Sequence, residues 1–189
     1  MGAGISVAYV RELASFLGEE GIATRDLLSG TGVSPELLEV ADAVIDRFAC
    51  HRVLARAAEL APPGFALRLG RRMRPGHHGI LGHAMMCSRT VGESLKTLER
   101  FAMTRGIPAS FRLLEGPHGQ RLKFDLAMPA GHLRREYLEW ALMIALWPVF
   151  QDRGSRKSYP CLIELDYSRP RHFDTYSTLI DCPIEFECS

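Results

Sequence analysis

Apolar residues recur at helical spacing through the first hundred positions of the chain. Val7, Val10, Leu13 and Leu17 lie three or four residues apart, which places them on one face of a helix that ends at Gly18. The same spacing, together with capping residues and Pro or Gly boundaries, predicts further helices over residues 26–28, 34–37, 48–60, 65–73, 79–87 and 90–102. The chain up to residue 102 is therefore predicted to be helical.

Alternation of apolar and polar residues replaces this spacing after Pro108. Leu122, Phe124 and Leu126 alternate with polar residues, as in a strand with one buried face. The pattern predicts strands at 111–115, 122–126, 161–167 and 184–188, a turn at 116–119, and helices at 131–151 and 171–180. This order predicts an α+β fold, in which an N-terminal helical region precedes a four-stranded, mainly antiparallel sheet backed by the long helix.

The length of 189 residues fits one domain. We expect a helical lead-in over residues 1–61 and an α+β core over residues 62–189. The longest run without a charged or strongly polar residue, 140–150, contains Pro148. A membrane span needs about 20 apolar residues, so this run predicts a helix buried in the protein and gives no reason to expect contact with a membrane.

Charge is balanced, with 23 Lys and Arg residues against 22 Asp and Glu residues. A domain that binds DNA usually carries a clear basic excess. Residues 11–40 have the spacing of a helix-turn-helix, but no Lys or Arg occurs from Asp26 to Asp46, and the acidic residues there would repel phosphates. We therefore do not expect this segment to recognise DNA.

Five cysteines are scattered along the chain without a CxxC pair. The first residues also lack the basic stretch and apolar run that mark an exported protein. These observations predict reduced thiols and a cytoplasmic protein. Cys182 and Cys188 lie close enough in sequence that a bridge between them is an alternative.

Two separated motifs carry a family resemblance. One begins at Phe65 with FALRLG and continues to Arg105, and the other ends in CPIEF at Phe186. In the first, the matching residues are Gly79, Leu81, Gly82, Ala84, Thr90, Gly92, Glu93, Leu95 and Leu98. Both motifs resemble the N-terminal ligand-binding domain of AraC-type bacterial transcription regulators. Physically, Gly79 and Gly82 indicate close packing of their helix against the sheet, and Thr90 with Glu93 forms a capping box.

The resemblance implies a single ligand-sensing domain, 1–189, that binds a small effector of apolar or amphipathic character. It implies that DNA is bound only by a C-terminal helix-turn-helix domain, which would be absent from this chain, and that the regulator forms a homodimer. Enzyme signatures such as GxSxG, a P-loop or HExxH do not occur in the sequence. We therefore predict neither catalytic residues nor a cofactor.

His77, His78, His83 and Cys87 are the residues that come nearest to a metal or haem site. They do not have the spacing of four zinc ligands, so no metal is predicted. A haem-based gas sensor is kept as the alternative function, and a small catalytic domain ranks below it.

Two groups of charged residues have competing interpretations. Glu136 and Glu139 on the long helix could act as general bases, but solvent exposure or pairing with neighbouring arginines is the simpler expectation. The basic cluster of Arg68, Arg71, Arg72 and Arg74 indicates either a solvated helix face or an anchor for an acidic effector or a second domain.

Aromatic residues and methionines gather on the segments 79–87, 111–126 and 131–151. We predict an effector pocket between these segments, because such side chains pack irregularly and line apolar pockets. Its predicted members are Leu81, Met85, Met86, Phe111, Phe124, Tyr137, Trp140, Met143 and Trp147. Arg105 is the candidate for holding an effector carboxylate.

The isolated chain is expected not to bind specific duplex DNA, because its charge is balanced and its helix-turn-helix-like segment is acidic. Electrophoretic mobility shift at about 0.15 M salt, with competitor DNA, tests this. A promoter fragment retained under those conditions would contradict the prediction.

Overall fold

The computed structural model describes residues 4–105, 109–116, 119–126, 133–151 and 162–188. Their helices are α1 (Val7–Glu19), α2 (Thr24–Leu28), α3 (Arg47–Leu60), α4 (Phe65–Arg72), α5 (Gly79–Met86), α6 (Val91–Phe101), α7 (Arg134–Gln151) and α8 (Phe173–Leu179). Short 3-10 turns are η1 (Pro35–Glu39), η2 (Pro75–His78) and η3 (Ala102–Arg105). Strands are β1 (Ile5–Ser6), β2 (Val44–Ile45), β3 (Ala109–Gly116), β4 (Gly119–Leu126), β5 (Ile163–Glu164) and β6 (Ile184–Glu185). The α+β class is confirmed, and the ladder of β1 with β2 was not predicted.

The described strands pair two by two. β1–β2 and β3–β4 are antiparallel, whereas β5–β6 is parallel. The predicted four-stranded sheet is therefore wrong for the described part of the chain. The hairpin β3–β4 packs against α6 and α7 instead of meeting the C-terminal strands edge to edge. Those strands are short, and the positive φ of 61° at Glu187 ends the extended conformation just after β6.

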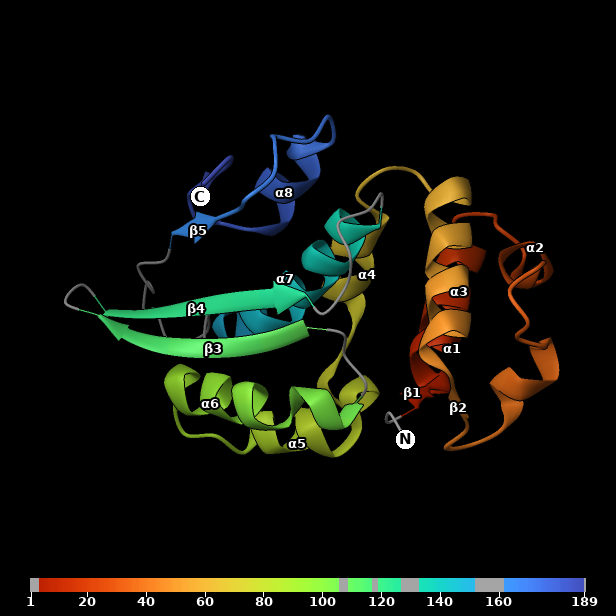
Figure 1. Cartoon of the computed structure of the whole chain (residues 1–189), viewed down its shortest axis with the longest axis horizontal. Helices are drawn as coiled ribbons and strands as arrows, with labels where there is room; N and C mark the ends of the chain where they lie inside the picture. Colours follow the sequence, from red (N-terminus) through yellow and green to blue (C-terminus); the bar gives the residue numbers. More distant parts are fainter. Residues whose placement is uncertain (1–3, 106–108, 117–118, 127–132, 152–161, 189) are drawn as a thin grey trace.

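Helix α7 is the centre of the packing (Figure 1), and its residues belong to three apolar clusters. Trp140 packs against α1, α3 and α4 in the first cluster. Ile144 joins the hairpin, α5 and α6 in the second, and Met143 joins β5 and α8 in the third. Every residue from 137 to 146 except Trp140 is buried, which confirms that this helix is covered on nearly all sides.

Helix α4 lies between α7 and the N-terminal helices. Phe65 and Leu69 belong to the first cluster, whereas Leu67 belongs to the third. Gly70 faces α7 so closely that a Cβ there would lie 2.5 Å from Cβ of Met143. The two helices can therefore approach only because position 70 has no side chain.

Ion pairs attach α4 to α1 along their polar sides. Arg68 contacts Glu20 at 3.0 Å, and Arg72 contacts Glu12 at 2.7 Å and also pairs with Glu19. These side chains are partly exposed, so each pair contributes about 1 kcal/mol or less to stability. The expectation that these arginines lie on a merely solvated helix face is therefore wrong for Arg68 and Arg72.

Local signals explain where the helices begin. The carboxylate of Asp46 accepts hydrogen bonds from the backbone amides of Phe48 and Ala49, at 2.8 and 2.9 Å, and starts α3. Thr90 starts α6 by accepting from the amide of Glu93 at 3.1 Å. The Glu93 carboxylate accepts from the amide of Arg89 rather than from that of Thr90, so only half of the predicted capping box forms.

Close packing at Gly82 was predicted, but its partner is different. A Cβ at Gly82 would lie 1.8 Å from the carbonyl oxygen of Pro75, so Gly82 itself packs on η2 and not on a strand. Gly79, the first residue of α5, has a φ of 58°, a conformation that glycine adopts without strain.

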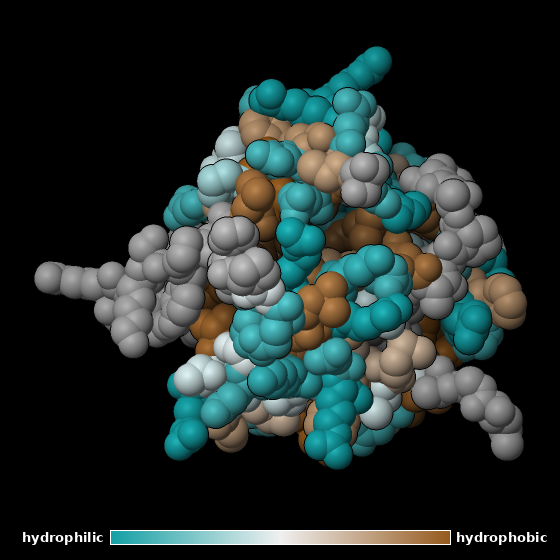
Figure 2. Space-filling view, turned by 60° about the vertical axis from the view of Figure 1, so that its left-hand side comes forward, coloured by the Kyte–Doolittle hydropathy of each residue, from teal (hydrophilic) through white to brown (hydrophobic). Residues whose placement is uncertain are grey.

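Hydrophobic residues reach the surface only locally on the face shown in Figure 2, where hydrophilic side chains surround them. Ile80 and Phe48 are the most exposed large hydrophobic residues, at 87% and 70%. Within the described ranges, no helix has the length and apolar character that crossing a bilayer requires.

Gly70→Ala is expected to lower the free energy of unfolding by about 1–3 kcal/mol, because the added methyl overlaps Met143. Gly18→Ala is the matched control. No atom lies within 4 Å of a Cβ at Gly18, so this change should be neutral or raise stability by up to about 1 kcal/mol through helix propensity. Urea unfolding measures both, and equal effects would contradict the proposed contact.

Candidate functional site

A cavity of about 50 Å³ lies between α1, α3, α4 and α7. None of the residues that line it carries a formal charge. They are Tyr9, Val10, Leu13, Cys50, Val53, Leu54, Ala66, Leu69, Met73, Tyr137 and Trp140. An apolar cavity of about 150 Å³ takes up benzene. The present volume therefore fits a few water molecules or the end of a larger ligand.

Two polar groups in the wall have protein partners. The Tyr9 hydroxyl shares a hydrogen bond of 3.2 Å with Nδ1 of His78. The indole N–H of Trp140 donates to the sulfur of Met73 at 3.1 Å. The rings of Tyr9 and Trp140 also meet edge to face, with centroids 5.2 Å apart. These contacts fix the two aromatic rings that join α1 to α7.

The remaining polar groups in the wall are neutral. Burial raises the pKa of the Cys50 thiol to about 12, and the negative charge of Asp46 adds to this effect. Burial likewise raises the pKa of Tyr137 above its usual range. Both groups therefore keep their protons near pH 7, and the wall presents hydrogen-bonding groups without charge.

The imidazole of His51 does not line the cavity but stacks on the ring of Tyr137, which does. The two rings are parallel within 6°, with centroids 6.2 Å apart. Nδ1 of His51 is buried and has no hydrogen-bond partner in the described part of the chain. Most buried polar atoms in proteins have a partner, so this atom requires an explanation.

Another face of α7 carries a buried polar network. Glu139 is 1% exposed, and its Oε1 lies 2.7 Å from Nε2 of His172 and 2.7 Å from the hydroxyl of Tyr176. Tyr176 donates to Glu139 and accepts from Tyr167, whose hydroxyl lies 2.6 Å away. Burial is the main cause that raises the pKa of Tyr176 above its usual range. The expectation that Glu139 faces solvent or pairs with an arginine is wrong, because the network ties α7 to α8.

A second polar contact strengthens this attachment. The guanidinium of Arg134 donates to both carboxylate oxygens of Asp166, at 2.8 and 2.6 Å. The start of α7 is thus bound to the segment that follows β5.

Comparison with known proteins decides the family. Residues 21–189 match the family described as the arabinose-binding domain of AraC transcription regulator, N-term. The chain belongs to this family. It is thus an effector-binding regulatory domain of the AraC type, in a family of regulators and not of enzymes.

Curated relatives of this AraC-type domain are transcriptional regulators. The ornithine utilization regulator of Pseudomonas aeruginosa is 23% identical over 184 residues, which cover 97% of this chain and 54% of that protein. Uncharacterized HTH-type transcriptional regulators of Mycobacterium bovis and Mycobacterium tuberculosis are each 35% identical over 133 residues, covering 68% of this chain and 38% of theirs. The chain therefore spans about half the length, or less, of the relatives it matches.

Only two of the ten predicted effector-binding residues, Tyr137 and Trp140, line the cavity of this AraC-type domain. Residues packed within or against the second cluster are Leu81, Met85, Phe111, Phe124 and Trp147. Met143 is buried against α4, whereas Met86 is 57% exposed. The side chain of Arg105 lies outside the described part of the structure. A role of these eight residues in effector binding stays a prediction.

The sequence interpretation missed the lining residues of α1, α3 and α4. Val10 and Leu13 were recognised as part of an apolar helix face, and Val53 and Leu54 belong to such a face as well. That periodicity predicts burial but not which helices meet, so it carries no signal for a cavity. Glu139 had a usable signal, because a charge within a helix that is otherwise apolar needs a buried partner.

The histidines considered for metal or haem have separate partners. His83 contacts the carbonyl of Gly79 at 2.8 Å, and Nδ1 of His77 accepts from the amide of Arg74 at 2.9 Å. Among the described residues, they do not gather with Cys87 into a group that could hold a metal ion.

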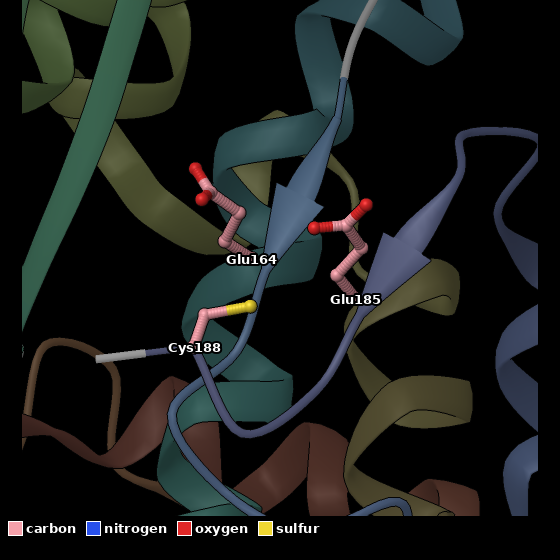
Figure 3. A group of neighbouring side chains, drawn as sticks. All are labelled: Glu164, Glu185 and Cys188. Atoms are coloured by element: carbon pink, nitrogen blue, oxygen red, sulfur yellow. The ribbon is translucent and has the colours of Figure 1, made fainter.

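Glu164, Glu185 and Cys188 do come together (Figure 3), with ligand atoms within 4.8 Å of one another. The two glutamates face each other across the β5–β6 ladder and are exposed. Exposed carboxylates often gather without a metal, and three ligands fall short of a structural zinc site. We therefore assign no function to this group.

The oxidation states of the cysteines differ from the sequence prediction. Cys188 is a free thiol, as are Cys50 and Cys87, so a bridge between Cys182 and Cys188 is not formed. Cys182 is disulfide-bonded, and the expectation that all five cysteines are reduced is therefore wrong.

Cys50 is expected to react with iodoacetamide at least about a hundredfold more slowly than Cys87 near pH 8, because only thiolates react and burial raises the pKa of Cys50. Mass spectrometry of labelled peptides over time measures both rates. In urea the two rates should converge. Rates within threefold of each other in the folded protein would show that the wall around Cys50 is open.

Proposed function

We propose that the cavity between α1, α3, α4 and α7 is the effector site of this AraC-type domain. The observation that supports this assignment is its position on α7, the helix that belongs to all three apolar clusters. A molecule bound there contacts Tyr137 and Trp140 directly. Occupancy then alters the packing of the helix on which the hairpin and the C-terminal segment both rest.

The effector is a small molecule of apolar or amphipathic character. A charged group in a wall without formal charges would lose its hydration and gain no counter-ion, which is unfavourable by several kcal/mol. A free amino acid such as ornithine carries such charges. This chain therefore responds to another class of molecule than the one for which its Pseudomonas aeruginosa relative is named.

The signal passes through α7 to α8. Glu139 and Arg134 on this helix bind Tyr176 and Asp166 of the C-terminal segment, so a shift of α7 changes both contacts. An effector that binds one arrangement of α7 better than another shifts the population toward it. The effector site and the C-terminal segment are then energetically coupled.

The complete regulator acts on DNA in the bacterial cytoplasm through a helix-turn-helix segment, of the kind for which its mycobacterial relatives are named. Its expected assembly is a homodimer, the commonest symmetric assembly of soluble proteins. Within the single sensing domain, residues 1–61 supply one wall of the site and residues 62–189 supply the other.

Leu54→Trp is expected to abolish effector binding, because the indole fills the cavity that Leu54 lines. The effector is first sought by thermal shift with uncharged amphipathic molecules and amino acids. A ligand at a hundred times its Kd stabilises the protein by about 2.7 kcal/mol. The variant should lose this stabilisation.

Leu37→Trp is the matched control. Leu37 is a half-buried leucine that packs against the same cluster without lining the cavity. It should retain the ligand-induced shift. If Leu54→Trp responds to the ligand as the wild type does, the effector binds elsewhere, and Trp147→Ala then tests the second cluster.

A further inference from the structure

Helix α5 presents a largely apolar face to solvent. Its buried side consists of Leu81, Gly82 and Met85. The exposed positions are Ile80, His83, Ala84, Met86 and Cys87, which ends the helix. At 3.6 residues per turn, these five positions fall within one continuous arc of the helix, which we call the α5 face. Ile80 in this face is the most exposed large hydrophobic residue among those that the structure describes.

The end of α6 adjoins the α5 face. Helix α6 runs back alongside α5, so its last turn lies beside the start of α5 (Figure 1). Phe101, the last residue of α6, and Met103 in η3 are both exposed. The guanidinium of Arg100 lies over the Phe101 ring, 5.2 Å from its centroid. Single exposed hydrophobic residues are ordinary, whereas a contiguous group of them is typical of a surface that another molecule covers.

The α5 face carries no formal charge. Residues 75–88 contain no Asp, Glu, Lys or Arg, although these residue types make up 24% of the chain. Nδ1 of His83 donates to the carbonyl of Gly79 at 2.8 Å. The hydroxyl of the adjoining Ser88 donates to the carbonyl of Ala84 at 3.1 Å. Polar groups of this surface are thus partly satisfied within the helix, and a partner gains mainly apolar contact there.

The absence of charge favours a second copy of this chain as the partner. In a twofold dimer, a residue near the axis meets the same residue of the other copy, so a charge there would face its own like. The α5 face has no charge that would be repelled in this way. A domain that binds DNA is basic and would find no acidic group on this face, whereas a second copy offers a matching apolar face.

We propose that two copies of this AraC-type domain meet through the α5 face, Phe101 and Met103, about a twofold axis close to Ala84. Ala84 has the smallest side chain of the face, so the two helices approach most closely there. This inference rests on the homodimer proposed above and adds the surface that forms it. Helix α5 begins directly after His78, which shares a hydrogen bond with Tyr9 of the cavity wall. One hydrogen bond therefore joins this contact to the proposed effector site.

Sedimentation velocity of the whole chain tests the contact. One short helix from each copy makes a small interface, so concentrations up to about 100 μM are needed. Ile80→Glu should raise the Kd of the dimer at least about tenfold, because it removes apolar contact and places like charges near the axis. Phe48→Glu is the matched control, since Phe48 is also an exposed hydrophobic residue but belongs to α3. Its Kd should stay within about twofold of wild type.

Cys87 provides a second measurement that does not perturb the face. It is an exposed free thiol, whereas Cys50 and Cys188 are at least partly buried. With the axis close to Ala84, the two copies of Cys87 lie less than one helical turn from the axis, so a bifunctional maleimide should join them. Cys87→Ser should abolish the cross-link and leave the dimer intact.

The outcomes separate the contact from the other proposals. If the chain dimerises but Ile80→Glu has no effect, or the cross-link survives in Cys87→Ser, the homodimer stands and the α5 contact is wrong. A dimer weakened equally by Phe48→Glu also overturns the contact. If the wild type is a monomer at about 100 μM, both the contact and the homodimer of this domain fail. The effector site is unaffected by any of these results, because Leu54→Trp tests it through ligand binding.

Discussion

Helix α7 must be covered by protein on nearly every side, because its residues 140–150 are apolar and only Trp140 among residues 137–146 is not buried. The rest of the fold supplies this cover from three directions. The N-terminal helices and α4 pack on one side, the hairpin with α5 and α6 on a second, and α8 with the C-terminal strands on a third. The cavity proposed as the effector site lies between α7 and the first of these layers.

Polar contacts determine how α7 sits within this cover. Apolar surfaces tolerate small sliding movements, whereas hydrogen bonds are directional and lose strength quickly when the geometry changes. Glu139 is satisfied by His172 and Tyr176, so it holds α7 in one register against α8. On the cavity side, α7 is held mainly by apolar packing against α1, α3 and α4. One side of the helix is therefore fixed by directional polar contacts, and the other by apolar contacts around the cavity.

The sequence predicted the helices and strands whose apolar residues recur at a regular local spacing. The stripe that includes Val10 and Leu13 predicted α1, and the alternation through Phe124 predicted β4. Contacts between distant segments were not predictable in this way. Two-residue strands such as β1 and β2 are too short to show a period, and the pairing of α4 with α7 depends on the missing side chain of Gly70. The residues of the candidate site were also predictable only in part. Tyr137 and Trp140 stood out by residue type, whereas Val53 and Leu54 look like any core residue.

The division of the core into three clusters has an evolutionary consequence. Most cavity-lining side chains of α1 and α3 belong to the first cluster alone, apart from the hairpin and from α8. Changes at well-separated positions act nearly independently on stability. Mutations along α1 and α3 can therefore reshape the cavity, generation by generation, while descendants inherit the contacts between α7 and α8 intact.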